Sequence, residues 1–260
     1  MRRVALLCAV LVGVGSAVAS AQEPLGPSAF GALGMYPKRL SCSDVPTYSE
    51  PRPTHRLVAA HEGDGRLRRA FSTPDTLMIP GGTGVGIQVG QQFFVRRLLL
   101  SPSRQKPSTE TPGMVHTAGW ITVIGSDQFA ALARIDHACD GFLKGDFLEP
   151  FTPAPMPTTI AAPGSPTFDD MGQLLFGNDG RRSFANGDII VINRGSQHGI
   201  TAGARLGIFR DTRSGGPLVP VGQAIVLTVG EDTATVIADR VRDALATGDW
   251  VGLQSGASRP

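Results

Sequence analysis

DTLMIPGGTGVGIQVG at residues 75–90 and DIIVINRGSQHGITAG at residues 188–203 share one pattern, and this pattern decides how the chain is organised. Both stretches begin with an aspartate and an apolar run, and both continue with glycines at the same spacing. The identical positions lie 113 residues apart, and they are Asp75, Ile79, Gly82, Gly86, Ile87 and Gly90 against Asp188, Ile192, Gly195, Gly199, Ile200 and Gly203. A fixed offset over this length indicates an internal repeat.

The similarity continues to the end of each repeat at a second offset. Beyond a loop that is ten residues longer in the first repeat, matching positions lie 103 residues apart, including Gly145 and Asp146 against Gly248 and Asp249. We predict a duplication, with one copy over residues 56–150 and the other over residues 172–254. The longer loop, near residues 98–118, is expected to project from the first copy.

Each copy is predicted to be all-β. Its apolar segments are short, rich in Val, Ile, Leu and Thr, and bounded by glycine, aspartate or proline, which is typical of strands. About six such strands in each copy fit a small closed barrel or a sandwich, because closure removes exposed strand edges. Glycine tolerates positive φ angles, so the repeated glycines and the Gly-Asp pairs are expected to form structural turns. These positions are Gly82, Gly86, Gly90, Gly145, Asp146, Gly195, Gly199, Gly203, Gly248 and Asp249.

The segments outside the two copies are rich in proline. Residues 151–171 contain five prolines and are expected to form an extended, semi-rigid linker between the copies. Residues 22–55 contain six prolines, and we expect little regular structure there. Residues 255–260 are predicted to be a short tail.

The first residues have the pattern of a secretory signal peptide. Arg2 and Arg3 precede an apolar run from Val4 to Val14, and small residues follow, with an A-x-A cleavage pattern at residues 19–21. We therefore predict a signal peptide over residues 1–21 and a periplasmic or secreted protein without an integral membrane span after cleavage. The alternative is an N-terminal segment that is retained as an anchor, although the run is shorter than the roughly 20 residues that a span needs.

The charge of the predicted mature chain is balanced. Without Arg2 and Arg3 it has 22 basic and 22 acidic residues, so it lacks the excess positive charge that binding of nucleic acid or anionic lipid requires. Nucleic acid is therefore not an expected partner.

Two cysteines, Cys42 and Cys139, remain once the signal peptide with Cys8 is removed. In an oxidising compartment, two cysteines indicate one disulfide bond. This bond would pin the segment before the first copy onto that copy, and it requires Cα atoms within about 7 Å of each other. Two free buried thiols are the competing interpretation.

The run NRGSQHGITAGARLGIFR at residues 193–210, followed by VGQAIV at residues 221–226 and GDWV at residues 248–251, resembles a pattern found in bacterial envelope proteins. It is similar to the C-terminal β-domain of the flagellar assembly protein T family. It also resembles the β-rich region that accompanies LysM modules in envelope proteins. The resemblance covers both copies and implies a periplasmic, non-enzymatic, protein-binding module. A LysM module itself is not expected, since glycines follow residues 71–77 where that module has a helix.

Candidate sites for chemistry are few. Asp136, His137, Cys139 and Asp140 are potential metal ligands, but neighbouring side chains of a strand point to opposite faces. Asp136 and Asp140 also recur as Asp239 and Asp243 beside arginines, which indicates a turn or ion-pair role. The glycine-rich run at residues 81–90 lacks the Lys-Ser/Thr ending of a phosphate-binding loop. We therefore predict no catalytic residue, no metal site and no cofactor.

One aromatic side chain is a candidate ligand contact. Trp120 aligns with Gln223 of the second copy, so the fold does not demand a tryptophan there, and an exposed aromatic ring is typical of carbohydrate binding. The sequence thus favours an exported envelope protein that acts as a non-enzymatic protein-binding or assembly module. The alternative is a protein of the periplasm that binds peptidoglycan or another glycan through Trp120.

Overall fold

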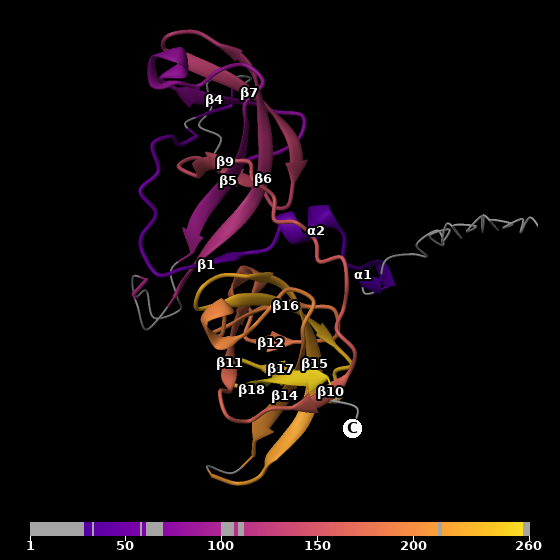
Figure 1. The fold of residues 1–260 in the computed structure, drawn as a ribbon. Helices are drawn as coiled ribbons and strands as arrows, with labels where there is room; N and C mark the ends of the chain where they lie inside the picture. Colours follow the sequence, from indigo (N-terminus) through magenta and orange to yellow (C-terminus); the bar gives the residue numbers. More distant parts are fainter. Residues whose placement is uncertain are drawn as a thin grey trace, which may run out of the picture.

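The chain has an all-β fold. The computed structural model describes residues 29–32, 34–57, 59–60, 70–99, 107–108, 112–212 and 215–256, which form two seven-stranded and two two-stranded sheets (Figure 1). The predicted signal peptide lies outside the described residues. In the part of the chain that is described, no helix has the length and apolar character that crossing a bilayer requires.

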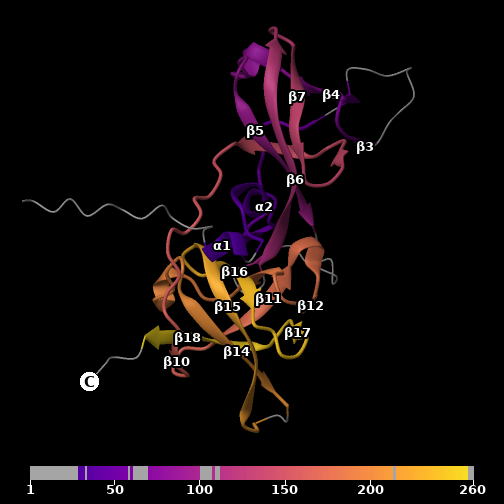
Figure 2. The ribbon, with the colours of Figure 1, turned by 90° about the vertical axis from the view of Figure 1, so that its right-hand side faces the viewer.

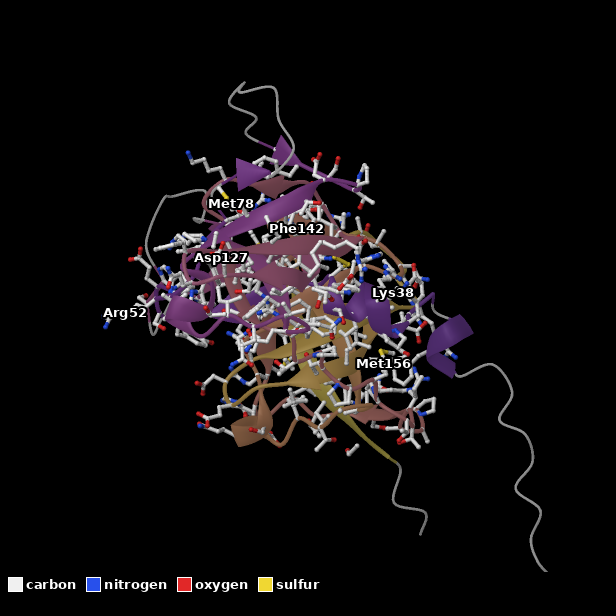
Figure 3. The ribbon with its side chains drawn as sticks, turned by 90° about the horizontal axis from the view of Figure 1, so that it is seen from above. Lys38, Arg52, Met78, Asp127, Phe142 and Met156 are labelled. Carbon is white, nitrogen blue, oxygen red and sulfur yellow. A yellow bond between two sulfur atoms is a disulfide. The ribbon has the colours of Figure 1, made fainter. Side chains whose placement is uncertain are left out.

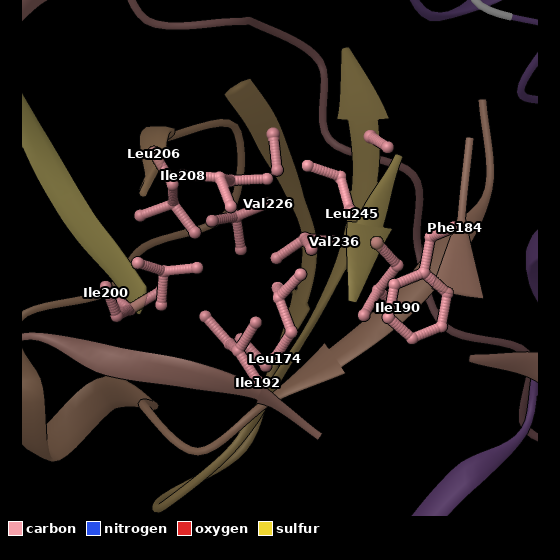
Figure 4. Packing of buried hydrophobic residues seen from close by; sticks show 14 of the residues in the cluster. Leu174, Phe184, Ile190, Ile192, Ile200, Leu206, Ile208, Val226, Val236 and Leu245 are labelled. Carbon is pink, nitrogen blue, oxygen red and sulfur yellow. The ribbon is translucent and has the colours of Figure 1, made fainter. Parts of the chain in front are cut away.

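The second β-unit, residues 172–256, is a closed six-stranded barrel. Its sheet closes because β18 pairs with both β14 and β11. The barrel strands, in spatial order, are β11 (Gly172–Gly177), β13 (Ile189–Ile192), β16 (Ala234–Asp239), β15 (Leu218–Val229), β14 (Arg205–Asp211) and β18 (Trp250–Gly256). Leu174, Ile190, Ile208 and Val226 meet in its interior (Figure 4). The predicted tail begins inside β18, which runs to Gly256.

The first β-unit, residues 56–150, has a matching sheet. Its strands, in spatial order, are β2 (Ala59–Ala60), β4 (Thr76–Pro80), β7 (Ala130–Ala138), β6 (Gly113–Ser126), β5 (Gln92–Leu99) and β9 (Phe147–Pro150). This sheet is more open than the barrel, and a bridge between Arg56 and Phe147 links its two ends. Phe142, which is fully buried, lies among the side chains of this unit (Figure 3).

The two units share their strand order. At each place in the sheet, the strand of the first unit has a counterpart in the second, from β2 and β11 to β9 and β18. The small sheet of β3 (Ala70–Phe71) and β8 (Phe142–Leu143) likewise matches that of β12 (Ser183–Phe184) and β17 (Leu245–Ala246). A shared order is what a duplication predicts, and the common origin of the two units stays a prediction.

The longer loop of the first unit was expected between residues 98 and 118, but both ends of this range are strand, so the loop is shorter than predicted. Its projection stays a prediction. β5 continues to Leu99 and β6 begins at Gly113, so much of the segment is strand. Strand β1 (Val45–Thr47) pairs with the start of β6, and Thr117 and Ala118 are fully buried. The N-terminal segment covers the start of β6, so this part of the predicted loop is buried. Residues 100–106 and 109–111 lie outside the described part.

The segment before the first unit is also more ordered than its prolines suggested. Within residues 22–55, the structure has two short helices, α1 (Ala29–Ala32) and α2 (Pro37–Ser41), followed by strand β1. We call residues 29–54 the N-terminal arm. Figure 2 shows its helices beside the junction of the two units. Proline favours the first helical position, and α2 begins with Pro37.

Apolar burial explains why the arm is ordered. Phe30, Met35 and Leu40 are buried against the outer face of the second barrel, with at most 3% of each exposed. That face presents Ile189, Ile225, Leu227 and Ile237. At the usual coefficient, burial of three such side chains contributes roughly 5 to 9 kcal/mol before conformational entropy is subtracted.

The matching face of the first unit is different, because no arm covers it. Its counterparts to Ile189, Ile225 and Ile237 are Thr76, Thr122 and Arg134. Strand β4 accordingly alternates between buried and less buried residues, whereas all four residues of β13 are buried. Burial of both faces of a strand produces a continuous apolar run, and burial of one face produces alternation.

The linker, residues 151–171, contacts the second barrel along its path. Met156, which is labelled in Figure 3, and Ile160 pack against the cluster of arm and barrel side chains. Strand β10 (Gly164–Pro166) then pairs with the end of β18. The linker is therefore extended, as expected, and it also contributes a short strand.

Candidate functional site

A disulfide bond ties the arm to the first β-unit. Cys42 follows α2 and Cys139 follows β7, and their Cα atoms are 5.6 Å apart. The bond that the sequence predicted is therefore present in the structure. The second unit has Arg242 at the position of Cys139, so the bond secures the arm and is not a requirement of the β-unit.

Beside the disulfide, a cleft of about 680 Å³ lies between the arm and the two β-units. Its walls come from α2, from the first unit and from the short helical turn η2 (Asn178–Gly180) of the second unit. Charged side chains of both signs line it, namely Lys38, Arg39, Asp44, His116, Asp140 and Asp179.

His116 is the centre of this arrangement. It projects from β6 and only 6% of it is exposed. Its Nδ1 lies 2.9 Å from Oδ1 of Asp44 in the arm and 3.4 Å from Oδ1 of Asp179 in η2. Its Nε2 lies 3.3 Å from Oδ2 of Asp140 in the first unit, although the angle there does not make a hydrogen bond. One imidazole thus faces carboxylates from three parts of the chain.

Asp44 holds this junction together through both carboxylate oxygens. Its Oδ1 receives the contact of His116, while its Oδ2 accepts a hydrogen bond of 2.7 Å from the backbone N–H of Asp179. The backbone N–H of Asp44 donates in turn to Oδ1 of Asn178 at 3.3 Å. Only 2% of Asp44 is exposed, so these partners replace the water that a carboxylate would otherwise bind.

The local charges shift the titration of His116. Its pKa is raised above the usual value, chiefly because the ring is hydrogen-bonded to Asp44. Burial of the ring opposes this shift, since burial disfavours the charged form. The charge of Asp44 and that of Asp179 raise the pKa further, whereas the guanidinium of Arg97 lowers it.

Asp44, His116 and Asp179 have a spacing that a cation could use, because one donor atom from each lies within 4.8 Å of the others. Cys42, His137 and Cys139 have the same spacing, but both sulfurs are in the disulfide. The distance between His116 and Asp44 fits a proton at this place. The 2.9 Å separation of His116 and Asp44 is the length of a charge-assisted hydrogen bond. Arg97, which pairs with His116 across strands β5 and β6, places a positive charge beside the ring, which opposes a bound cation and also lowers the pKa of His116.

The four potential ligands between Asp136 and Asp140 do not converge. Asp136 contacts Thr122 and Arg134, and His137 stacks on Trp120 with ring centroids 4.5 Å apart. Cys139 is in the disulfide, and Asp140 faces His116. The imidazole of His137 does lie within 4.8 Å of the sulfurs of Cys42 and Cys139, whereas Asp136 and Asp140 face other partners.

Trp120 is not the exposed platform that its alignment with Gln223 suggested, and this expectation is wrong. Only 8% of Trp120 is exposed. Its ring packs against Phe94 of the neighbouring strand, against Phe151 of the linker and against His137. Because the linker closes over the indole, an open face for stacking on a sugar is absent at this residue.

The predicted turn glycines divide into two groups. Gly86 and Gly199, Gly90 and Gly203, and Gly145 and Gly248 all have φ angles between 73° and 95°. Gly195 has an extended φ of −132°, so a positive φ is not its role. A side chain at Gly195 would instead overlap the carbonyls of Gly230 and Glu231, and one at Gly82 would overlap that of Asp127. These two glycines allow a close approach of the backbone.

The aspartates of the two Gly-Asp turns form a repeated ion pair. Asp146 accepts from Arg97 at 3.0 Å, and Asp249 accepts from Arg210 at 2.7 Å. Each carboxylate also accepts the backbone N–H three residues before it. Asp140 and Asp243 lie 3.8 Å and 2.8 Å from the same two arginines, in agreement with the predicted ion-pair role. The predicted turn residues Asp146 and Asp249 therefore also form an ion pair with an arginine in each unit.

The His116 junction was not predicted from the sequence. Its members are far apart in the chain and lie in none of the shared glycine patterns. One signal was present: His116 aligns with Val219 of the second unit, which is 42% exposed, so the fold alone does not place a histidine there. The position is buried in the first unit because the arm covers β6.

A second feature lies at the end of the first unit that is remote from the second barrel (Figure 2). The helical turn η1 (Gly82–Val85) and the turn between β6 and β7 meet there, joined by backbone hydrogen bonds such as Gly81 to Phe129. We call Val85, Val89, Ile124 and Phe129 the apolar tip. They are 51%, 62%, 47% and 74% exposed.

The fold of the unit does not account for the apolar tip. The counterparts of Val85, Val89 and Phe129 in the second unit are His198, Ala202 and Asp232. The counterpart of Ile124 is Leu227, which is buried beneath the arm. Several exposed apolar side chains at one end of a unit, which packing does not require, are typical of an interaction site.

No protein-family model matches this chain, and no curated protein matches it.

Proposed function

We propose that the chain is an exported protein of the cell envelope that acts as a non-enzymatic protein-binding or assembly module. The observation that carries this proposal is the apolar tip, which exposes Phe129 and its neighbours at one end of a rigid β-unit. Burial of a large aromatic side chain at an interface contributes more to affinity than its neighbours do. The partner is a protein of the envelope with a complementary apolar surface.

Two further observations support the compartment and the class of function. The Cys42–Cys139 disulfide suits an oxidising environment, in agreement with the signal peptide predicted for residues 1–21. The resemblance to β-domains of envelope proteins implies the same class. Binding of peptidoglycan is the alternative, but its candidate contact, Trp120, is buried.

The second unit supplies matched substitutions for the test. A triple variant, Val85→His, Val89→Ala and Phe129→Asp, installs at the tip the residues that the second unit has at these positions. Because a related fold already accommodates them, the variant is expected to fold with an unchanged melting temperature. We expect it to bind the envelope partner at least about tenfold more weakly, which corresponds to about 1.4 kcal/mol.

Cross-linking in envelope fractions identifies the partner. The affinity of the purified partner is then measured for the wild type and for the triple variant. Val219→Asp is the control, because Val219 is exposed on the second barrel, away from the tip. An equal affinity of wild type and triple variant would contradict the proposed surface. Retention on purified peptidoglycan without a protein partner would favour the glycan alternative, and turnover of a substrate from a hydrolase panel would overturn both.

A further inference from the structure

The three parts of the chain that meet at His116 are otherwise separate. β6 belongs to the first unit, Asp44 to the arm and Asp179 to η2 of the second unit. Figures 1 and 2 show the lower end of β6 reaching the second unit beside the arm. The hydrogen bonds of this junction all involve Asp44. Its backbone N–H donates to Asn178, and its carboxylate accepts from the backbone N–H of Asp179 and contacts Nδ1 of His116.

The protonation state of His116 decides how well this junction is satisfied. A neutral imidazole has one N–H, whereas an imidazolium has two and can donate from both nitrogens. Carboxylates face both nitrogens here, with Asp44 and Asp179 at Nδ1 and Asp140 at Nε2. The charged ring therefore balances the buried carboxylate of Asp44, and the neutral ring removes a counter-ion that contacts this carboxylate directly.

Of the other charged groups around the ring, Arg97 and Arg39 are held by other partners. Arg97, on the adjacent strand β5, is hydrogen-bonded to Asp146 and to the backbone of Gly141. Lys38 and Arg39 of α2 line the cleft, and Arg39 donates to the backbone carbonyls of Gly34 and Gly187.

We propose that His116 is a proton-controlled latch, which docks η2 of the second unit against the arm and the first unit when protonated and releases it when neutral. The apolar contact of Phe30, Met35 and Leu40 with the second barrel persists in both states, since it contains no titratable group. Release therefore opens the cleft at η2 and leaves the two units attached through the arm. This inference is independent of the apolar tip, which lies at the opposite end of the first unit.

The direction of the pH dependence follows from the raised pKa of His116. A group whose pKa is higher in the folded state stabilises that state fully below its unfolded value, about 6.5 for histidine. This contribution is lost as the pH rises through the raised pKa. The latch is accordingly closed below about pH 6.5 and opens as the pH rises through the raised pKa of His116.

The backbone N–H of Asp179 is the natural probe, because it donates to Asp44 across the latch. We expect its hydrogen-exchange protection factor to fall at least tenfold as NMR shows the His116 ring losing its proton. The backbone N–H groups of β16, inside the second barrel, should keep their protection over the same range. Constant protection of Asp179 throughout the titration of His116 would overturn the proposal.

Variants separate charge from hydrogen bonding. The His116→Asn variant keeps a neutral donor near the position of Nδ1 but cannot carry a positive charge. The backbone N–H of Asp179 in this variant should therefore exchange rapidly at every pH. His198→Asn, a substitution in the turn η3 (Ser196–His198), should leave the pH dependence as in wild type. Asp179→Asn is a second variant, and it should fold normally because the side chain of Asp179 is 67% exposed. It removes a carboxylate beside His116, so the midpoint of the His116 titration should shift to lower pH.

A bound cation would produce a different result at the same side chains. Under the latch proposal, neither EDTA nor zinc ions at a concentration equal to that of the protein changes the protection of Asp179. If EDTA abolishes its protection, or if zinc restores protection at a pH where His116 is neutral, the junction is a metal site and the latch is rejected.

Discussion

Replacing both cysteines, as Cys42→Ser and Cys139→Ser, is expected to lower the free energy of unfolding by up to about 4 to 5 kcal/mol. The two cysteines are 97 residues apart, and the chain-entropy model assigns a loop of this size a stabilisation of that order. Such a loss is a large share of the stability of an ordinary domain. Urea unfolding of the oxidised protein, the double variant and the reduced wild type measures it.

The double variant should also loosen the arm before the whole chain unfolds. Strand β1 pairs with β6 only a few residues after Cys42, so its backbone N–H groups should exchange faster. The reduced wild type serves as the control, because it lacks the bond without any substitution. Equal urea midpoints for all three forms would show that the arm is held by its apolar contacts alone.

Replacing Gly82 by alanine is expected to cost about 3 kcal/mol or more. A Cβ at Gly82 would overlap the carbonyl oxygen of Asp127 and lie 2.6 Å from that of Ala130. Its φ of 40° adds the strain of a left-handed conformation. Both neighbouring atoms belong to backbone in the β6–β7 turn, so relaxation would displace that turn.

Two related substitutions separate overlap from strain. Gly86→Ala combines a φ of 86° with open space around the Cβ, so it should cost only about 1 to 2 kcal/mol. Gly195→Ala creates overlap at an extended φ and should fall between the other two. Thermal unfolding of the three variants gives the order, and equal losses at Gly82 and Gly86 would contradict the role assigned to close approach.

The repeat predicted the fold well because its pattern is local. Strand-length apolar runs and glycines at fixed spacing specify turns and strands without reference to distant residues, and the strand order of both units agrees with them. The role of Gly195 could not be predicted from a local pattern. It depends on the position of residues 230 and 231, which only the folded sheet determines.

The sequence contained one indication that a further segment covers the second unit, although the prolines of the arm suggested an irregular chain there. Residues 189–192 read IIVI where residues 76–79 read TLMI, so one strand is apolar on both faces and the other is not. An additional layer on the second unit follows from this difference. The difference does not indicate which segment supplies the layer, because many short apolar stretches could pack there. The His116 junction depends on the same packing, since the arm brings Asp44 to β6.

The order of synthesis gives the arm a further consequence. Phe30, Met35 and Leu40 are made early, whereas the strands that bury them are completed only when residue 237 has been added. Until then, apolar groups at both ends of the chain remain exposed, which favours association with other chains or with a chaperone. Contacts that span some 200 residues also close slowly. A fragment that begins at residue 172 should therefore aggregate, whereas the whole chain buries the same face by itself.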